Sequence, residues 1–183
     1  MIKNIRPYKN IKPIFGKKVY VDDAAIIIGN VTLGDDVSVW PGAVIRGDMH
    51  EIRIGCRTNI QDTAVLHITH ASSFNPKGWP LIIGDDVVIG HGAILHGCSL
   101  GNRILVGNGV IINDGAVVQN EVLIGAGTVV PPGKILESGN LYVGSPSRIS
   151  RKITKKEKDF FVYSPANYVG LKNEYLKDAQ LQS

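Results

Sequence analysis

Cysteine, aromatic side chains and long hydrophobic runs are all scarce in this chain of 183 residues. Cys56 and Cys98 form no CxxC pattern, so we expect buried free thiols rather than a disulfide or a cysteine metal site. No stretch approaches the ~20 apolar residues of a membrane span, and residues 1–16 have no apolar segment of signal-peptide type. These absences favour a cytoplasmic protein without a membrane partner.

Positive charge is also scarce over most of the chain. The formal net charge is +4, but lysine and arginine crowd into residues 3–18 and 148–158, and the region between them is net acidic. A nucleic-acid-binding surface needs a basic stripe interleaved with aromatic residues. We interpret the two basic segments as solvated arms and expect no nucleic-acid partner.

What the chain has instead is a period of six residues. The aliphatic residues that set this period are Ile27, Leu33, Val39, Ile45, then Ile54, Ile60, Leu66, then Ile83, Ile89, Leu95, and then Leu100, Val106, Ile112, Val118, Ile124 and Val130. A small or β-branched residue follows four positions later at most of them. A six-residue period predicts an all-β parallel β-helix in which three hexads make one triangular coil.

The period divides the chain into three parts of a single domain. Residues 1–18 are expected to form an entry arm, residues 19–147 the coils, and residues 152–180 a C-terminal helical segment. Thr154 and Glu157 form a capping box at the start of that segment. Pro165 is expected to kink or split it into helices over roughly 155–163 and 165–178, which cover one flank of the coils.

Two interruptions break the period, a short one between Ile45 and Ile54 and a longer one over residues 71–80. Insertions leave a solenoid as loops on one face, which is often the binding face. The longer loop leaves directly after His67 and His70. The sequence therefore predicts a functional site near the base of this loop.

The phase of each histidine in the period predicts where it lies. His67 and His96 each follow the third aliphatic residue of a coil, so they share one corner, one rung apart. Parallel strands lie ~4.8 Å apart, and two imidazoles at that spacing can bind one metal ion. His91 falls at the second corner, where only a neighbouring subunit of a trimer could bring it to the other two. Three imidazoles from two subunits leave one position open for water, as in catalytic zinc sites.

The same counting places further polar residues beside these histidines. Arg46 and Asp48 fall at the His67 corner, where they can form a charge-assisted pair at a subunit interface. Gln61 and Asp62 fall at the His91 corner and can orient the imidazoles. His70 completes a His-x-x-His pattern, and it is either a possible extra ligand or an anchor for the loop.

Several motifs combine these residues: Ile45-Arg46-Gly47-Asp48, Asn59-Ile60-Gln61-Asp62, His67, Gly90-His91 and Leu95-His96-Gly97-Cys98. Over nearly the whole chain they resemble the gamma-class carbonic anhydrases and their homologues among hexapeptide-repeat proteins. The resemblance implies a left-handed parallel β-helix with a C-terminal α-helix, assembled as a homotrimer. It also implies that His67 and His96 of one subunit and His91 of the next are the metal ligands.

The resemblance implies a lyase that hydrates CO₂ reversibly by means of a metal-bound hydroxide at the trimer interfaces. The metal would be Zn²⁺, or Fe²⁺, Co²⁺ or Ni²⁺, since three imidazoles accept each of them. Arg46 and Asp48 resemble an interface salt bridge, while Gln61 and Asp62 resemble residues that contact the metal-bound solvent. Tyr168 is a third candidate catalytic residue, from the C-terminal helix.

Two departures from the resemblance concern proton transfer. The most active members carry Glu directly after the Arg-x-Asp motif, where this chain has Met49, and acidic residues on the loop, where residues 71–80 have none. A group with a pKa near the working pH transfers protons best. The sequence therefore predicts weak or absent anhydrase activity with metal binding retained.

Two other functions are compatible with the sequence. A hexapeptide-repeat acyltransferase would use one histidine as a general base and bind coenzyme A without a metal, and a thioester hydrolase would use the same hydroxide on a different carbonyl. The third possibility is a non-catalytic metal-binding scaffold trimer.

Overall fold

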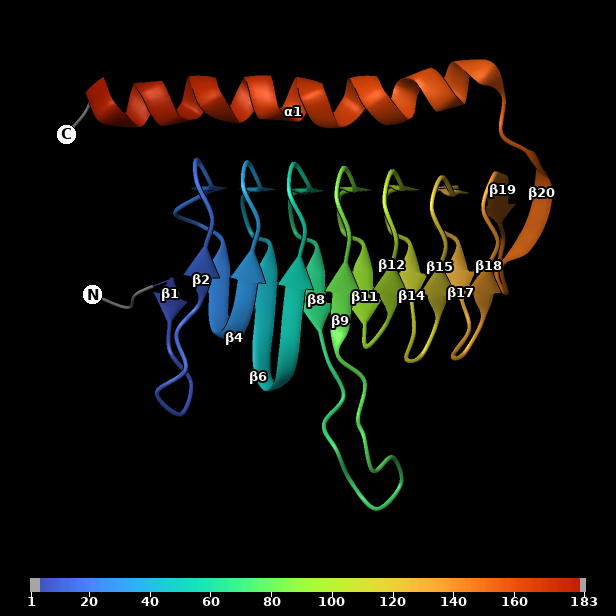
Figure 1. Ribbon diagram of the computed structural model, residues 1–183, viewed down its shortest axis with the longest axis horizontal. Helices are drawn as coiled ribbons and strands as arrows, with labels where there is room; N and C mark the ends of the chain where they lie inside the picture. Colours follow the sequence, from blue (N-terminus) through green and yellow to red (C-terminus); the bar gives the residue numbers. More distant parts are fainter. Residues whose placement is uncertain (1–3, 182–183) are drawn as a thin grey trace.

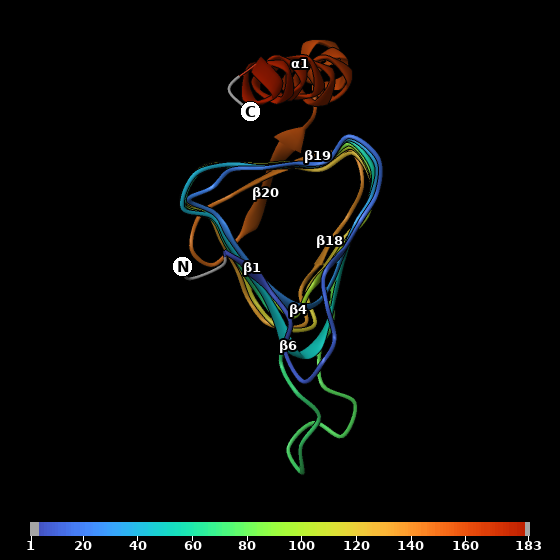
Figure 2. The same cartoon turned by 90° about the vertical axis from the view of Figure 1, so that its left-hand side faces the viewer.

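The computed structural model describes residues 4–181, and side chains to residue 178, as a parallel β-helix with one long helix along its flank (Figure 1). Viewed along its axis, the β-helix is a triangle with a helix above one side and a loop projecting from the opposite corner (Figure 2). The predicted left-handed parallel β-helix with a C-terminal α-helix is confirmed. The helix within the described range is not apolar enough to span a membrane.

The side of the triangle beneath the helix, here called face one, is one sheet of parallel strands. Its strands are β3 (Tyr20–Val21), β5 (Ser38–Val39), β7 (Asn59–Ile60), β10 (Val88–Ile89), β13 (Leu105–Val106), β16 (Leu123–Ile124) and β19 (Asn140–Val143). At the C-terminal end, β20 (Arg148–Lys152) pairs with β19 in the antiparallel direction and ends the sheet. All five residues of β20 are exposed.

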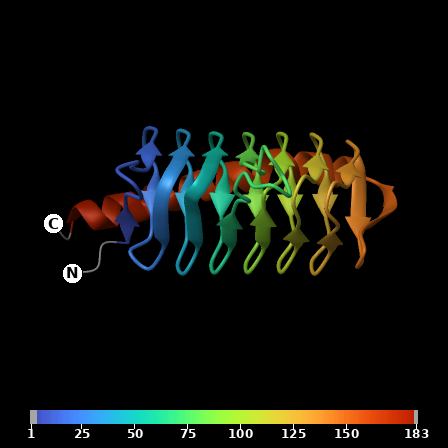
Figure 3. The same ribbon diagram turned by 90° about the horizontal axis from the view of Figure 1, so that it is seen from below.

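The other two sides form one continuous sheet, because β4 (Ile26–Leu33) and β6 (Val44–Ile54) run along both of them. Face two also holds β1 (Ile5–Arg6), β8 (Val65–His67), β11 (Ile94–His96), β14 (Ile111–Ile112) and β17 (Val129–Val130). Face three also holds β2 (Ile14–Phe15), β9 (Leu81–Ile83), β12 (Ser99–Leu100), β15 (Val117–Val118) and β18 (Ile135–Leu136). The shorter predicted interruption is thus absorbed within β6, while the longer one leaves between β8 and β9 (Figure 3).

The six-residue period corresponds to ladders of buried aliphatic side chains inside the triangle. Strand pairing on face two aligns Ile27, Ile45, Leu66, Leu95, Ile112 and Val130, all with no exposed surface. Removing this surface from water at about 25 cal/mol per Å² is the main stabilisation of the fold. Cys56 and Cys98 are both free thiols, with Cys98 buried and Cys56 half-buried.

The C-terminal segment is a single helix, α1 (Lys155–Leu181), so the prediction that Pro165 splits it is wrong. Proline removes one backbone donor and so costs one hydrogen bond, to the carbonyl four residues earlier. Packing on both sides of Pro165 outweighs that cost. Phe161 packs against Val88 and Leu105 before it, and the Tyr175 ring contacts Trp40 after it.

The start of α1 follows the predicted capping box. The Glu157 carboxylate accepts a hydrogen bond from the Thr154 backbone N–H at 2.7 Å, and the Thr154 hydroxyl accepts one from the Glu157 N–H at 3.2 Å. Arg151 holds the same carboxylate in an ion pair, and the pKa of Glu157 falls to about 2, with this bond as its first cause. The helix then runs back along face one, so its far end lies beside the first coils (Figure 1).

Candidate metal centre

His67 and His96 lie side by side at the corner between faces two and three. Pairing of β8 with β11 aligns the two residues, and their ring centroids are 5.1 Å apart. The Nδ1 atom of His67 lies 3.1 Å from the Nε2 atom of His96. Two nitrogen ligands of one tetrahedral zinc ion, each ~2.0–2.1 Å from the metal, lie roughly 3.3 Å apart. The corner therefore presents two donor atoms at a spacing that suits one metal ion.

The second ring nitrogen of each histidine lies against a carboxylate. His67 Nε2 is 3.3 Å from Asp48 Oδ1, and His96 Nδ1 is 2.6 Å from Asp114 Oδ1. A carboxylate on one ring nitrogen fixes the imidazole and leaves the other nitrogen free to bind a metal.

Charges at this corner favour the neutral form of His67. Burial lowers the pKa of His67, and the positive charge of Arg46 lowers it further, against the opposing effect of Asp48. Burial alone would raise the pKa of Asp48, but hydrogen bonds from Arg46 and His67 outweigh it and hold that pKa low. Metal ligands must be neutral imidazoles, so the corner is prepared for a cation.

Arg46 and Asp48 form an ion pair within one chain. Both residues stand on β6 two positions apart, so their side chains share one side of the strand. Asp48 therefore touches Arg46 and His67 together, as the predicted phase requires.

His91, Gln61 and Asp62 lie at the other edge of face two, at its corner with face one. His91 Nδ1 is 3.0 Å from Asp62 Oδ2, so this imidazole also keeps one nitrogen on a carboxylate. The Gln61 amide donates a hydrogen bond of 2.7 Å to the Tyr168 hydroxyl, which reaches the corner from α1. Burial and then the charge of Asp62 raise the pKa of Tyr168, so the phenol keeps its proton.

One chain does not bring all the predicted ligands together. Strands of face two separate the His91 corner from the His67 corner, and no group of three His, Cys, Asp or Glu side chains within residues 4–178 forms a complete metal site. His91 is about half exposed, at 52% of its side-chain surface, and open to a neighbouring molecule.

The loop over residues 71–80 is fixed at its base. Thr69 and Trp79 exchange two backbone hydrogen bonds of 3.0 and 2.8 Å, and His50 Nε2 lies 3.2 Å from the Lys77 carbonyl oxygen. His70 is exposed and makes no hydrogen bond to His67 or His96 among the described residues.

Asp114 and Thr69 were not among the predicted site residues. Asn113 directly follows Ile112, which puts it at the phase of His67 and His96 one rung further along, and Asp114 comes next. The period therefore contains a signal for Asp114, which it assigns to the same corner as His67 and His96.

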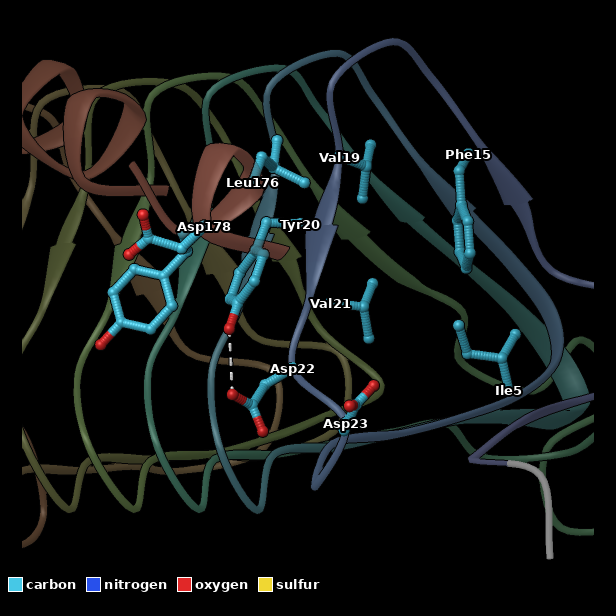
Figure 4. A pocket seen from close by; sticks show the side chains of 10 residues that line it. Ile5, Phe15, Val19, Tyr20, Val21, Asp22, Asp23, Leu176 and Asp178 are labelled. Carbon is cyan, nitrogen blue, oxygen red and sulfur yellow. Dashed lines mark hydrogen bonds between the residues drawn. The ribbon is translucent and has the colours of Figure 1, made fainter. Parts of the chain in front are cut away.

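A pocket of about 560 Å³ lies elsewhere, between the first coils and the far end of α1 (Figure 4). Apolar side chains such as Phe15 and Leu176 line it, and Tyr20 donates a hydrogen bond of 3.0 Å to Asp22 at its edge. None of the predicted metal-site residues lines this pocket.

A triangular parallel β-helix built on a six-residue period is the fold of hexapeptide-repeat proteins. Residues 12–47 match the family model described as bacterial transferase hexapeptide (six repeats). The chain is 54% identical to the protein YrdA of Escherichia coli over 172 residues, and this alignment covers 94% of each chain. It is 46% identical over 158 residues to a probable carbonic anhydrase of Methanocaldococcus jannaschii, covering 86% of this chain and 95% of that one.

Among solved structures, a putative acetyltransferase of Bacillus cereus superposes with a TM-score of 0.87 at 36% identity, covering 93% of this chain and 95% of that one. With these relatives, the chain belongs to the gamma-class carbonic anhydrase-like family of hexapeptide-repeat proteins.

Proposed function

We propose that the protein is a homotrimer that binds one divalent metal ion at each subunit interface and hydrates CO₂ reversibly there. His67 and His96 of one subunit and His91 of the next would hold the metal. One observation carries this proposal: each of the three imidazoles has one nitrogen on a carboxylate, Asp48, Asp114 or Asp62. Imidazoles arranged in this way are typical of metal ligands.

The surface between the two corners supports a neighbouring subunit. Val65 and Ile94 stand on β8 and β11 directly beside His67 and His96, and they are 37% and 39% exposed. Across the His67 corner, Val117 and Ile135 on face three are also exposed. Apolar side chains in adjacent rungs make a patch of the kind that mediates association, and cyclic packing would bring the two corners together.

The metal, when bound, would lower the pKa of a water molecule to about 7 and supply hydroxide at neutral pH. Asp48, Asp62 and Asp114 would hold the three imidazoles in the orientation that binding needs. The Gln61 amide is fixed by Tyr168, and its oxygen is then available to accept a hydrogen bond from substrate or solvent. Tyr168 remains protonated and can donate its own hydrogen to an oxygen of CO₂ or bicarbonate.

The proposed reaction also needs a route for the proton. Residues 71–80 hold no carboxylate, and Met49 stands 48% exposed beside Asp48. Met49 and the loop over residues 71–80 therefore offer no carboxylate or imidazole that could transfer a proton near neutral pH. We therefore propose slow turnover with metal binding intact, and Zn²⁺, Fe²⁺, Co²⁺ or Ni²⁺ as the metal.

The direct experiment is stopped-flow CO₂ hydration on metal-loaded wild type and on His91→Ala. We expect the wild type to exceed the uncatalysed rate and His91→Ala to fall to the uncatalysed rate, because a two-imidazole site holds the metal weakly. Equal rates for the two proteins would reject the catalytic proposal.

An acyltransferase is the second candidate, favoured by the likeness to the putative acetyltransferase of B. cereus. It would bind coenzyme A and need no metal, so calorimetry with acetyl coenzyme A in the presence of a chelator separates the two. Metal uptake without activity on CO₂, thioesters or acetyl donors would instead favour a metal-binding scaffold.

A further inference from the structure

Asp114 occupies a distinct place at the His67 corner. It follows β14, the strand that pairs with β11, so it lies one rung beyond His96. Both carboxylate oxygens are used: Oδ1 lies 2.6 Å from His96 Nδ1, and Oδ2 accepts a hydrogen bond of 2.7 Å from the Thr69 hydroxyl. A carboxylate held at both oxygens has a fixed direction.

The chain leaves room for this carboxylate. At Gly97 a Cβ atom would lie 2.4 Å from Asp114 Oδ1 and 2.6 Å from the Trp79 Cβ, and the φ of Gly97 is +50°. Both facts favour glycine at position 97, where the Asp114 side chain reaches from its own coil to His96.

The loop base belongs to the same network. Thr69 receives and donates backbone hydrogen bonds with Trp79 at the foot of the loop, and its hydroxyl then holds Asp114. Two hydrogen bonds, from Thr69 to Asp114 and between Asp114 and His96, thus connect the base of the loop to the imidazole of His96.

We propose that Asp114, aligned by Thr69, is a positioning residue that keeps the proton of His96 on Nδ1 and presents Nε2 as a donor atom. The inference deepens the proposed function, on which its metal-dependent part rests. The Nε2 atom is the one that faces His67 across 3.1 Å. Carboxylate partners of this kind change metal affinity by about 10–100-fold when they are removed.

The first test measures zinc affinity by competition with a chromophoric chelator, together with the visible spectrum of the cobalt form. We expect Asp114→Asn to weaken zinc binding about 10–100-fold and to change the cobalt spectrum. Thr69→Val should weaken binding by a smaller factor, and Thr69→Ser, which keeps the hydroxyl, should retain wild-type affinity. The matched control is Asp85→Asn, a corner aspartate that binds the Cys56 N–H and touches no histidine.

A second measurement, on metal-free protein, keeps the inference separate from the proposed function. Imidazole ¹⁵N shifts should show the Nδ1–H tautomer of His96 in the wild type and a mixture of tautomers in Asp114→Asn. That result in a protein that binds no metal would support the positioning role and reject the metal centre. Asp114→Asn with wild-type zinc affinity, cobalt spectrum and tautomer would overturn the inference.

Discussion

At the scale of single residues, the same imidazole–aspartate contact occurs at both corners of face two. Each imidazole keeps one nitrogen on an aspartate that the period delivers to the same corner. The other nitrogens of His67 and His96 face each other at 3.1 Å, a contact that needs a proton on one of them or a cation between them. The side chains are thus arranged before any metal arrives.

Gly97 offers a residue-scale prediction. Gly109→Ala should lower the free energy of unfolding by about 1–2 kcal/mol, because the φ of Gly109 is +65°. No steric clash adds to this loss, since a Cβ there meets nothing within 4 Å. Gly97→Ala has the same kind of backbone, yet it should cost a further ~1–3 kcal/mol, since Asp114 and Trp79 must move. Urea unfolding of both variants at one protein concentration measures the difference.

Zinc affinity provides the second readout for this pair of glycines. The Asp114 side chain is the easier of the two neighbours to displace, and its displacement breaks the bond to His96. Zinc affinity should therefore fall in Gly97→Ala and stay unchanged in Gly109→Ala. Matching losses of stability and affinity in the two variants would contradict the steric argument.

The candidate site was partly predictable at this scale, because phase alone places a residue at a corner. His67, His96, Arg46 and Asp48 were assigned to one corner, and the structure places them there. Phase does not say which way a ring turns or which neighbour takes its second nitrogen. The contacts made by Asp114 and Thr69 depend on side-chain orientation, so phase alone does not predict them.

At the scale of elements, α1 is attached to the β-helix by a buried ion pair. Lys172 has no exposed surface, and its Nζ lies 2.8 Å from Asp36 Oδ1, on a corner of the second coil. Asp36 keeps 30% of its side chain in contact with water. The two partners are therefore unequal: one charge is buried and the other is partly hydrated.

This inequality predicts different costs for removing each partner. Lys172→Met should change stability by no more than about 1 kcal/mol, because it removes the buried charge and leaves a hydrated one. Asp36→Asn should lower the free energy of unfolding by about 2–3 kcal/mol, because the buried ammonium loses its carboxylate partner and keeps the neutral Asn173 Oδ1 at 2.7 Å. Asparagine tolerates the φ of +58° at this corner, so the backbone is conserved.

Thermal unfolding of Lys172→Met, Asp36→Asn and the double variant gives both costs and their coupling. The double variant should be more stable than Asp36→Asn alone. Equal destabilisation by the two single variants would mean that the pair contributes as a surface ion pair does.

Elements were predictable from the sequence wherever one local rule dominates. The six-residue period set the strands, and Thr154 with Glu157 set the start of α1. The length of α1 was not predictable, because a proline rule is local and the packing of Phe161 and Tyr175 on face one is not. Tertiary contacts decided that element.

At the scale of the whole molecule, the proposed site requires residues from two chains, and mixed trimers test this. Neither His67→Ala nor His91→Ala should bind metal in a pure trimer. In a 1:1 mixture of the two subunits, each trimer that contains both variants should regain one of its three sites, because only one of its interfaces receives the undamaged half of each variant. Metal content of trimers purified through two different tags measures the recovery.

The control for this experiment is a mixture of His67→Ala with His96→Ala. Both substitutions damage the same half, so no arrangement of subunits restores an interface. Recovery in this mixture, or its absence in the first one while the wild type binds metal, would contradict a site shared between subunits.

The antiparallel strand β20 determines how far the structure can grow. Every coil of a parallel β-helix offers its last rung as a template for another, and a chain that stopped at β19 would present such an open edge. Arg148, Arg151 and Lys152 place positive charge along that edge in the reversed direction. A second molecule that approached this edge of face one would meet repulsion and mismatched hydrogen-bonding groups, so β20 disfavours end-to-end pairing of this sheet.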